Sequence, residues 1–173
     1  MRKYGSNGLR LAGFQAKVFE ASRNKCACSS PIFLRRFLMS DVLQTLDKNE
    51  SSLIRWTVNE ALEEIELEFG PSNYGTEKYN GGALFWMGYI YRYISYTRDI
   101  NTRLLFKLFK GKQLYGLFPV YHTQDPEWCI KNLLELNCQS EDIFDKDWRL
   151  KRAMCEKSGP YNPAGQPMRV VNK

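Results

Sequence analysis

The chain has 173 residues, of which 43% are hydrophobic, 14% aromatic and 25% charged, the length and composition of about one globular domain. Its mean hydropathy is −0.47, and no apolar run approaches the roughly 18 residues that cross a bilayer, which excludes a membrane-spanning helix. The net charge is +6, and the five cysteines are an odd number that fits free thiols in a reducing compartment, so we expect a cytoplasmic protein.

The positive charge is concentrated at the two ends of the chain. Residues 1–50 carry a net charge of +5, residues 51–100 carry −3, residues 101–150 are neutral and residues 151–173 carry +4. Basic ends of this kind contact phosphate or an acidic protein partner, and they are equally typical of a flank that only keeps a chain in solution.

Up to three helical segments are predicted in the first fifty residues. Residues 9–22 place apolar side chains three and four positions apart, as on one face of a helix. Residues 29–31, Ser-Ser-Pro, supply an N-cap hydroxyl and then a proline at the first position of a second helix, which carries Arg35 and Arg36 side by side. Residues 40–46 either form a further short helix capped by their leading Ser-Asp pair or continue the second one.

The clearest amphipathic pattern runs from Leu53 to Phe69. Six apolar residues form one stripe of this predicted helix, while four glutamates lie on its other faces; the stripe consists of Ile54, Val58, Ala61, Leu62, Ile65 and Phe69. Gly70-Pro71 ends the helix, and the turn-forming residues 72–80 predict a loop. The acidic surface is either a solvated face or a docking surface for a basic group, such as the chain's own termini.

Residues 81–98 are apolar or aromatic on almost every face, which is typical of the central helix of a domain. Gly88 within this helix would let a neighbouring helix approach closely. Arg92 belongs to the same surface, and because burying an unpaired charge is costly, we expect it to have a carboxylate partner or an exposed head group.

Short helices and loops are predicted after this segment. In chain order they are short helices at 101–109 and 112–118, a loop at 119–123, a helix opened by Asp125-Pro126, and a last helix from about 140 to 157. The remaining residues are rich in glycine and proline, a composition typical of a linker or a disordered tail.

These patterns predict an all-α fold, a compact multi-helix domain around the central aromatic-rich helix at about 81–98. Residues 1–8 are expected to form a flexible basic N-terminus and residues 9–157 a single helical domain. Residues 158–173 are expected to form a disordered, basic C-terminal tail.

Patterns typical of catalysis or metal binding are sparse. His122 is the single histidine, and it lies in a predicted loop that leads into a helix, where a structural hydrogen bond is its expected role. The sequence has no Gly-x-Ser-x-Gly elbow, no phosphate-binding Gly-x4-Gly-Lys loop and no His-Glu-x2-His pair. One close cysteine pair, Cys26-x-Cys28, does not meet the spacing of a zinc site. We therefore expect a protein that is not an enzyme, with no catalytic residue, no metal and no cofactor.

A helix-turn-helix interpretation gives an alternative function, that of a DNA-binding regulator. Residues 91–110 have the length of such a motif, with a turn near 98–100. Its second helix carries Arg103, Lys107 and Lys110 on a basic face, and these three residues would contact nucleic acid. The missing turn glycine and the aromatic first helix count against this interpretation.

Three motifs carry a resemblance to known proteins: GGALFWMGYIYRY at 81–93, YHTxDP at 121–126, and SSPIFLRRF at 29–37. They resemble a family of small uncharacterised bacterial proteins found in toxin–antitoxin gene neighbourhoods, over roughly residues 10–137, and gene neighbourhood says nothing of mechanism. The resemblance implies a non-catalytic, antitoxin-like inhibitor that binds a co-encoded toxin, with DNA as a second partner. Its candidate binding residues, polar groups within or beside the motifs, are Arg35, Arg36, Arg92 and His122.

Overall fold

The computed structural model describes residues 3–139, and every regular element in that range is helical. The elements are α1 (Ser6–Lys25), α2 (Ser30–Met39), α3 (Asp41–Leu46), a 3-10 turn η1 (Ser51–Leu53), α4 (Val58–Phe69), α5 (Gly81–Arg98), α6 (Thr102–Leu108), α7 (Gly111–Tyr121) and α8 (Pro126–Gln139). The predicted all-α fold is confirmed for these residues. The helix expected at 140–157 and the tail expected at 158–173 lie outside the described residues.

The chain divides into two compact units, one ending at Pro126 and the other beginning at Glu127. The single domain expected over residues 9–157 therefore spans parts of both units and extends beyond the described residues. Of the second unit the structure describes helix α8, whose predicted start at Asp125-Pro126 is confirmed. One face of α8 is buried, and it consists of Cys129, Ile130, Leu133 and Leu134.

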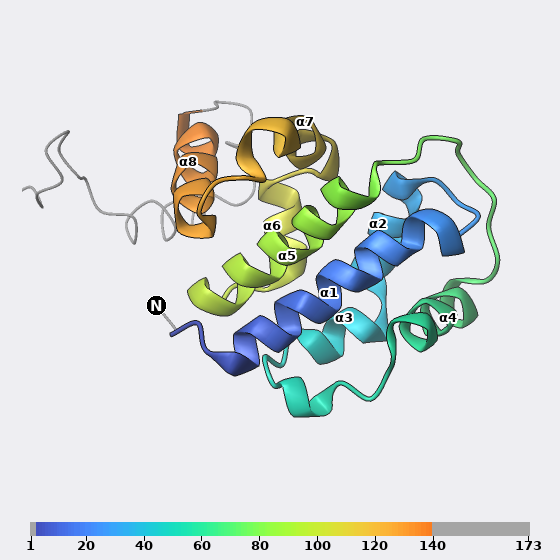
Figure 1. The fold of residues 1–173 in the computed structure, drawn as a ribbon. Coiled ribbons are helices and arrows are strands. Elements are labelled where there is room, and N and C mark those ends of the chain that lie inside the picture. The colour runs from blue at the N-terminus through green and yellow to red at the C-terminus, as the bar shows by residue number, and fades with distance from the viewer. Residues whose placement is uncertain (1–2, 140–173) are drawn as a thin grey trace, which may run out of the picture. The chain divides into compact units, whose positions relative to one another are not determined.

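Helices α1 and α5 form the centre of the first unit, where they lie side by side and run in opposite directions (Figure 1). A Cβ atom on Gly88 would lie only 2.9 Å from the Cα atom of Ala16 and 2.9 Å from the carbonyl oxygen of Gln15. Glycine at this point of α5 therefore permits the close helix approach that the sequence predicts. Between Ala83 and Thr97, Phe85 is the one exposed side chain of α5, which confirms that this is the central helix.

Aromatic contacts join the surrounding helices to the central pair. Phe19 of α1 meets two phenylalanines of α2 edge to face, with ring centroids 4.8 Å from Phe37 and 5.7 Å from Phe33. On the other helix of the pair, Tyr91 of α5 stacks against Phe106 of α6 with centroids 3.9 Å apart. Figure 1 shows the α2–α4 segment beside α1, and α6 and α7 beside α5. Helices from both halves of the unit therefore pack against the central pair.

The loop between α4 and α5 is tied to the start of α2 by backbone hydrogen bonds. The amides of Ser29 and Ser30 donate to the carbonyl oxygens of Tyr74 and Glu77, at 3.0 Å and 2.8 Å. The Ser30 hydroxyl accepts from the amide of Tyr79 at 2.9 Å. The predicted hydroxyl cap of α2 is therefore wrong. The N-cap residue is Ser29, which makes no side-chain capping bond, and Pro31 is the second helical residue. The Ser30 hydroxyl binds the loop amide of Tyr79 and does not cap the helix.

Two helix starts differ from the prediction because of side-chain caps. Helix α4 begins at Val58 and not at Leu53, because Thr57 and Glu60 form a capping box. The Thr57 hydroxyl accepts a hydrogen bond from the Glu60 amide at 3.3 Å, and the Glu60 carboxylate accepts one from the Thr57 amide at 2.7 Å. The Ser40 hydroxyl accepts a hydrogen bond from the amide of Leu43 at 3.3 Å and so caps α3. Residues 41–46 are therefore a separate short helix and not a continuation of α2.

Two further boundaries extend beyond the prediction. Helix α1 begins at Ser6, so residues 6–8, expected in the flexible N-terminus, are helical, and Tyr4 packs against Tyr93 with ring centroids 4.3 Å apart. Helix α7 continues through Pro119 to Tyr121, so the loop predicted at 119–123 is wrong for its first three residues. Pro119 is exposed, and it lies near the end of the helix, where the loss of one backbone hydrogen bond interrupts only the last turns.

Candidate functional site

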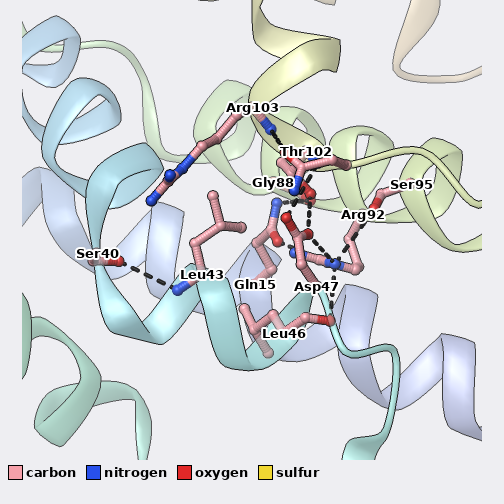
Figure 2. A network of polar contacts seen from close by, with 11 residues as sticks. Gln15, Ser40, Leu43, Leu46, Asp47, Gly88, Arg92, Ser95, Thr102 and Arg103 are labelled. Atoms are coloured by element: carbon pink, nitrogen blue, oxygen red, sulfur yellow. Dashed lines mark hydrogen bonds and ion pairs between the residues drawn. The ribbon is translucent and has the colours of Figure 1, made fainter.

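Arg92 lies at the centre of a buried polar network (Figure 2). Its side chain is fully buried, and its Nη1 atom lies 2.9 Å from Oδ1 of Asp47, the carboxylate at the end of α3. Nε donates to Oε1 of Gln15 at 2.9 Å, and Nη1 also donates to the carbonyl oxygen of Leu46 at 3.0 Å. Burial lowers the pKa of the Arg92 guanidinium from its ordinary value, and the Asp47 carboxylate acts in the opposite direction. The predicted carboxylate partner of Arg92 is confirmed.

The same network links four helices. Asp47 accepts hydrogen bonds from the hydroxyl and the amide of Thr102, at 2.6 Å and 3.3 Å, which attaches α6 to the end of α3. The Gln15 amide of α1 donates to the carbonyl oxygen of Gly88 on α5 at 3.1 Å. Arg92 is fully buried and engaged in these bonds, which gives it a structural role in the described residues, and the binding role that the resemblance implies stays a prediction.

Arg36 and Arg103 both bind carbonyl groups at helix ends. Arg36 Nη1 donates to the carbonyl oxygen of Gly70 at 2.7 Å, so it holds the end of α4 against α2. Arg103 Nε donates to the carbonyl oxygen of Leu38 at 2.6 Å, at the end of α2. A cation at a helix C-terminus also opposes the negative end of the helix dipole. Both arginines therefore position helices, and the nucleic-acid role predicted for Arg103 competes with this bond.

His122 follows the last residue of α7 and is exposed. Its Nδ1 atom lies 2.8 Å from the carbonyl oxygen of Phe118, one turn earlier, and its ring packs 4.5 Å from the Phe118 ring. The predicted structural hydrogen bond is thus observed, with an Nδ1–H donor closing the end of the helix. Among the described residues, no group of three or more histidine, cysteine, aspartate or glutamate side chains could hold a metal ion.

Arg35 has different surroundings from its neighbour Arg36. It is exposed and lines a cavity of about 410 Å³ together with Lys110 and Lys112, the residues on either side of the first residue of α7. The structure thus brings together a residue predicted to bind a protein partner and one predicted to bind nucleic acid. Lys112 was missed, because nothing in its local sequence indicates that α7 begins beside α2. Lys107, the remaining candidate, is exposed on α6 and is not among the residues that line this cavity.

The outward surface of α4 is acidic around one leucine. The helix contains five glutamates and no lysine or arginine. Leu67 is 82% exposed, and Glu63 and Glu64 precede it by four and three residues, which places them beside it on one helix face. Glu60 lies one turn further back. We call these four residues the α4 face; the sequence indicates its acidic character but not the exposure of Leu67.

Comparisons with protein-family models, with curated proteins and with solved structures find no match to this chain. Within the described residues, no helix is both long enough and apolar enough to span a membrane.

Proposed function

We propose that this protein is a non-catalytic interaction module that binds a basic protein partner through the α4 face. The observation that carries the proposal is the 82% exposure of Leu67 within a group of glutamates. An apolar side chain surrounded by charged groups has the layout of a binding hot spot and its polar rim. A partner with a small apolar recess bordered by lysines or arginines would complement this surface in shape and in charge.

Helix energetics support a binding role for the α4 face. Glutamates spaced three or four positions apart repel each other, by about 0.2–0.5 kcal/mol per pair in an isolated helix. The capping bond from the Thr57 amide stabilises the Glu60 carboxylate, but the pairs that Glu60 forms with Glu63 and Glu64 have no basic residue on α4 beside them, although the whole chain carries a net charge of +6. A basic partner would relieve the repulsion on binding.

The partner that we propose is a toxin encoded beside this chain, which would make the protein an antitoxin-like inhibitor. This part of the proposal depends on the resemblance carried by residues 81–93 and 121–126. Electrostatic complementarity would act mainly on the association rate, so binding should weaken as the salt concentration rises.

Co-expression with the product of the adjacent open reading frame tests the proposal. The full chain should co-purify with that product and rescue growth from its toxicity. The substitution Leu67→Ala should weaken binding at least tenfold, as truncation of a hot-spot residue does. Leu9→Ala is the matched control, since Leu9 is also an exposed helical leucine, at 56%, but lies on α1. Failure to co-purify and to rescue growth, or equal binding by the two variants, would contradict the proposal.

The alternative function, DNA binding through residues 91–110, has a narrower basis. Helix α6 has seven residues, of which Thr102, Leu105 and Leu108 are buried. A gel shift on the protein's own promoter, in which Lys107→Ala with Lys110→Ala removes binding and added salt weakens it steeply, would favour this function over the first.

A further inference from the structure

The cavity beside Arg35 is open to solvent and is bordered by segments that are far apart in the sequence. It has a volume of about 410 Å³ and is lined by α2, the loop before α5, α6 and the start of α7. This volume lies within the range of about 300–1,000 Å³ that is usual for small-molecule sites. We call it the Arg35 cavity.

The polar lining of the Arg35 cavity is predominantly basic. Arg35, Lys110 and Lys112 supply three positive charges, and Glu77 supplies one negative charge. The net charge of +2 matches a phosphate monoester, which carries about −1.5 to −2 at neutral pH. Arginine and lysine also provide the N–H donors that phosphate oxygens accept.

The rest of the lining is mainly apolar and includes two aromatic residues, Phe106 and the buried Tyr79. Leu34 and Leu38 come from α2 and Phe106 from α6. The Phe106 ring is stacked on Tyr91, at 3.9 Å between centroids and 11° between planes, and Tyr91 is fully buried. The aromatic part of the wall is therefore held in place by the core, which favours a ligand with a planar ring.

Close packing fixes the position of the two lysines. A Cβ atom on Gly111, which lies between them, would come within 2.8 Å of the Leu34 side chain, so glycine lets the start of α7 press against α2. Helix α7 thereby carries Lys110 and Lys112 to the same cavity as Arg35. Helix packing thus places the three basic residues around one cavity, and this placement is independent of the α4 face.

We infer that the Arg35 cavity binds a small organic phosphate with a planar ring, of the nucleoside monophosphate class. The phosphate would lie among Arg35, Lys110 and Lys112, and the ring would lie against Leu34, Leu38 and Phe106. Neither half of such a molecule alone satisfies both parts of the lining. The ligand would bind as a regulator or as a cargo, with no bond made or broken.

Isothermal titration calorimetry on the full chain at low salt tests this inference, with adenosine monophosphate as the probe. Adenosine monophosphate should bind at least tenfold more tightly than adenosine or inorganic phosphate. Replacing both Lys110 and Lys112 by alanine should weaken binding about 100-fold, since each hydrogen bond to a charged group contributes roughly tenfold or more. Lys107→Ala, a change on α6 outside the cavity lining, should leave binding unchanged.

A second variant guards against loss of binding through misfolding. Glu77→Gln removes the one negative charge of the lining and should tighten binding several-fold, a gain that a damaged fold would not produce. No heat from adenosine monophosphate at millimolar concentration would overturn the inference, as would equal binding of adenosine or an unchanged affinity in Glu77→Gln. Tight binding of a DNA duplex through Lys110, with no binding of adenosine monophosphate, would also overturn it and would favour the DNA-binding alternative.

Discussion

Replacing Asp47 by alanine should lower the free energy of unfolding by about 4 kcal/mol, within the range of about 3–5 kcal/mol for breaking a buried ion pair. The Arg92 side chain is fully buried, so its guanidinium cannot turn to water when the carboxylate is removed. It would keep the neutral acceptors on Gln15 and Leu46, which do not balance its charge. Thr102 would also lose the acceptor for its hydroxyl and amide, which loosens α6.

The opposite substitution, Arg92→Met, should be less damaging. The Asp47 side chain is 13% exposed and keeps its two hydrogen bonds from Thr102, so its charge retains partial hydration. We expect a loss of about 1–3 kcal/mol, the usual penalty for an unpaired polar group. The double variant should be more stable than Asp47→Ala alone, because methionine leaves no buried charge without a partner.

Equilibrium unfolding in urea, followed by circular dichroism, measures these differences. A change in the midpoint at constant slope reports stability, and a changed slope would indicate a different denatured or native state. For a chain of this length a loss of 4 kcal/mol should lower the melting temperature by roughly 8–16 °C. A loss below about 1 kcal/mol for Asp47→Ala, or strict additivity in the double variant, would refute the reasoning.

Three further predictions test other parts of the structure. In the same unfolding assay, Gly88→Ala should destabilise the protein by about 1–3 kcal/mol, because the added Cβ would overlap α1. The control Gly13→Ala, whose Cβ would have no atom within 4 Å, should stabilise the protein by about 0.5–1 kcal/mol. Equal effects of the two substitutions would contradict the close helix contact. Thr57→Ala should lower stability by about 1 kcal/mol through loss of the α4 cap, and no change would show that the cap is dispensable. Burial, with a smaller effect of Cys28, raises the pKa of the Cys26 thiol from 9.0 to about 11. As the pH rises, the thiol therefore ionises in the unfolded chain before it ionises in the folded protein. Its contribution to the free energy of unfolding is lost between these two pH values. Alkylation of Cys26, followed by mass spectrometry against pH, should accordingly rise with a midpoint near 11 and not near 9.

The sequence predicts the central helix well because its pattern is local and strong. From residue 81 to residue 98 nearly every face is apolar or aromatic, and such a helix has no stable position except the interior. The role of Gly88 is predictable for the same reason. A helix buried on all sides has close neighbours, and a glycine within it permits such a neighbour to approach. The cap at Thr57 and Glu60 was also available, as a Thr-x-x-Glu spacing, and would have corrected the start of α4.

The site residues were harder to predict because their roles depend on long-range packing. The sequence predicts that Arg92 has either a carboxylate partner or an exposed head group, but the partner, Asp47, lies 45 residues away and is one of several acidic residues. The same limit hid the convergence of Lys112 with Arg35, which requires α7 to begin beside α2. The nucleic-acid role predicted for Arg103 rests on the length of a helix-turn-helix segment and on charge, whereas its bond to the end of α2 depends on the turn between α5 and α6.

Helix α2 shows how adjacent residues of one sign can serve unrelated purposes. Successive residues of a helix point about 100° apart, so Arg35 and Arg36 face different neighbours. Arg36 reaches the end of α4 and helps to fix the helix that carries the α4 face, while Arg35 lines the cavity shared with α7. An Arg36 variant should therefore disturb partner binding by displacing α4 and leave adenosine monophosphate binding intact, and an Arg35 variant should do the reverse. Substitutions of two adjacent residues on one helix should thus separate the two proposed sites. If Arg35 and Arg36 belonged to one basic surface patch, the two substitutions would have the same effect on binding.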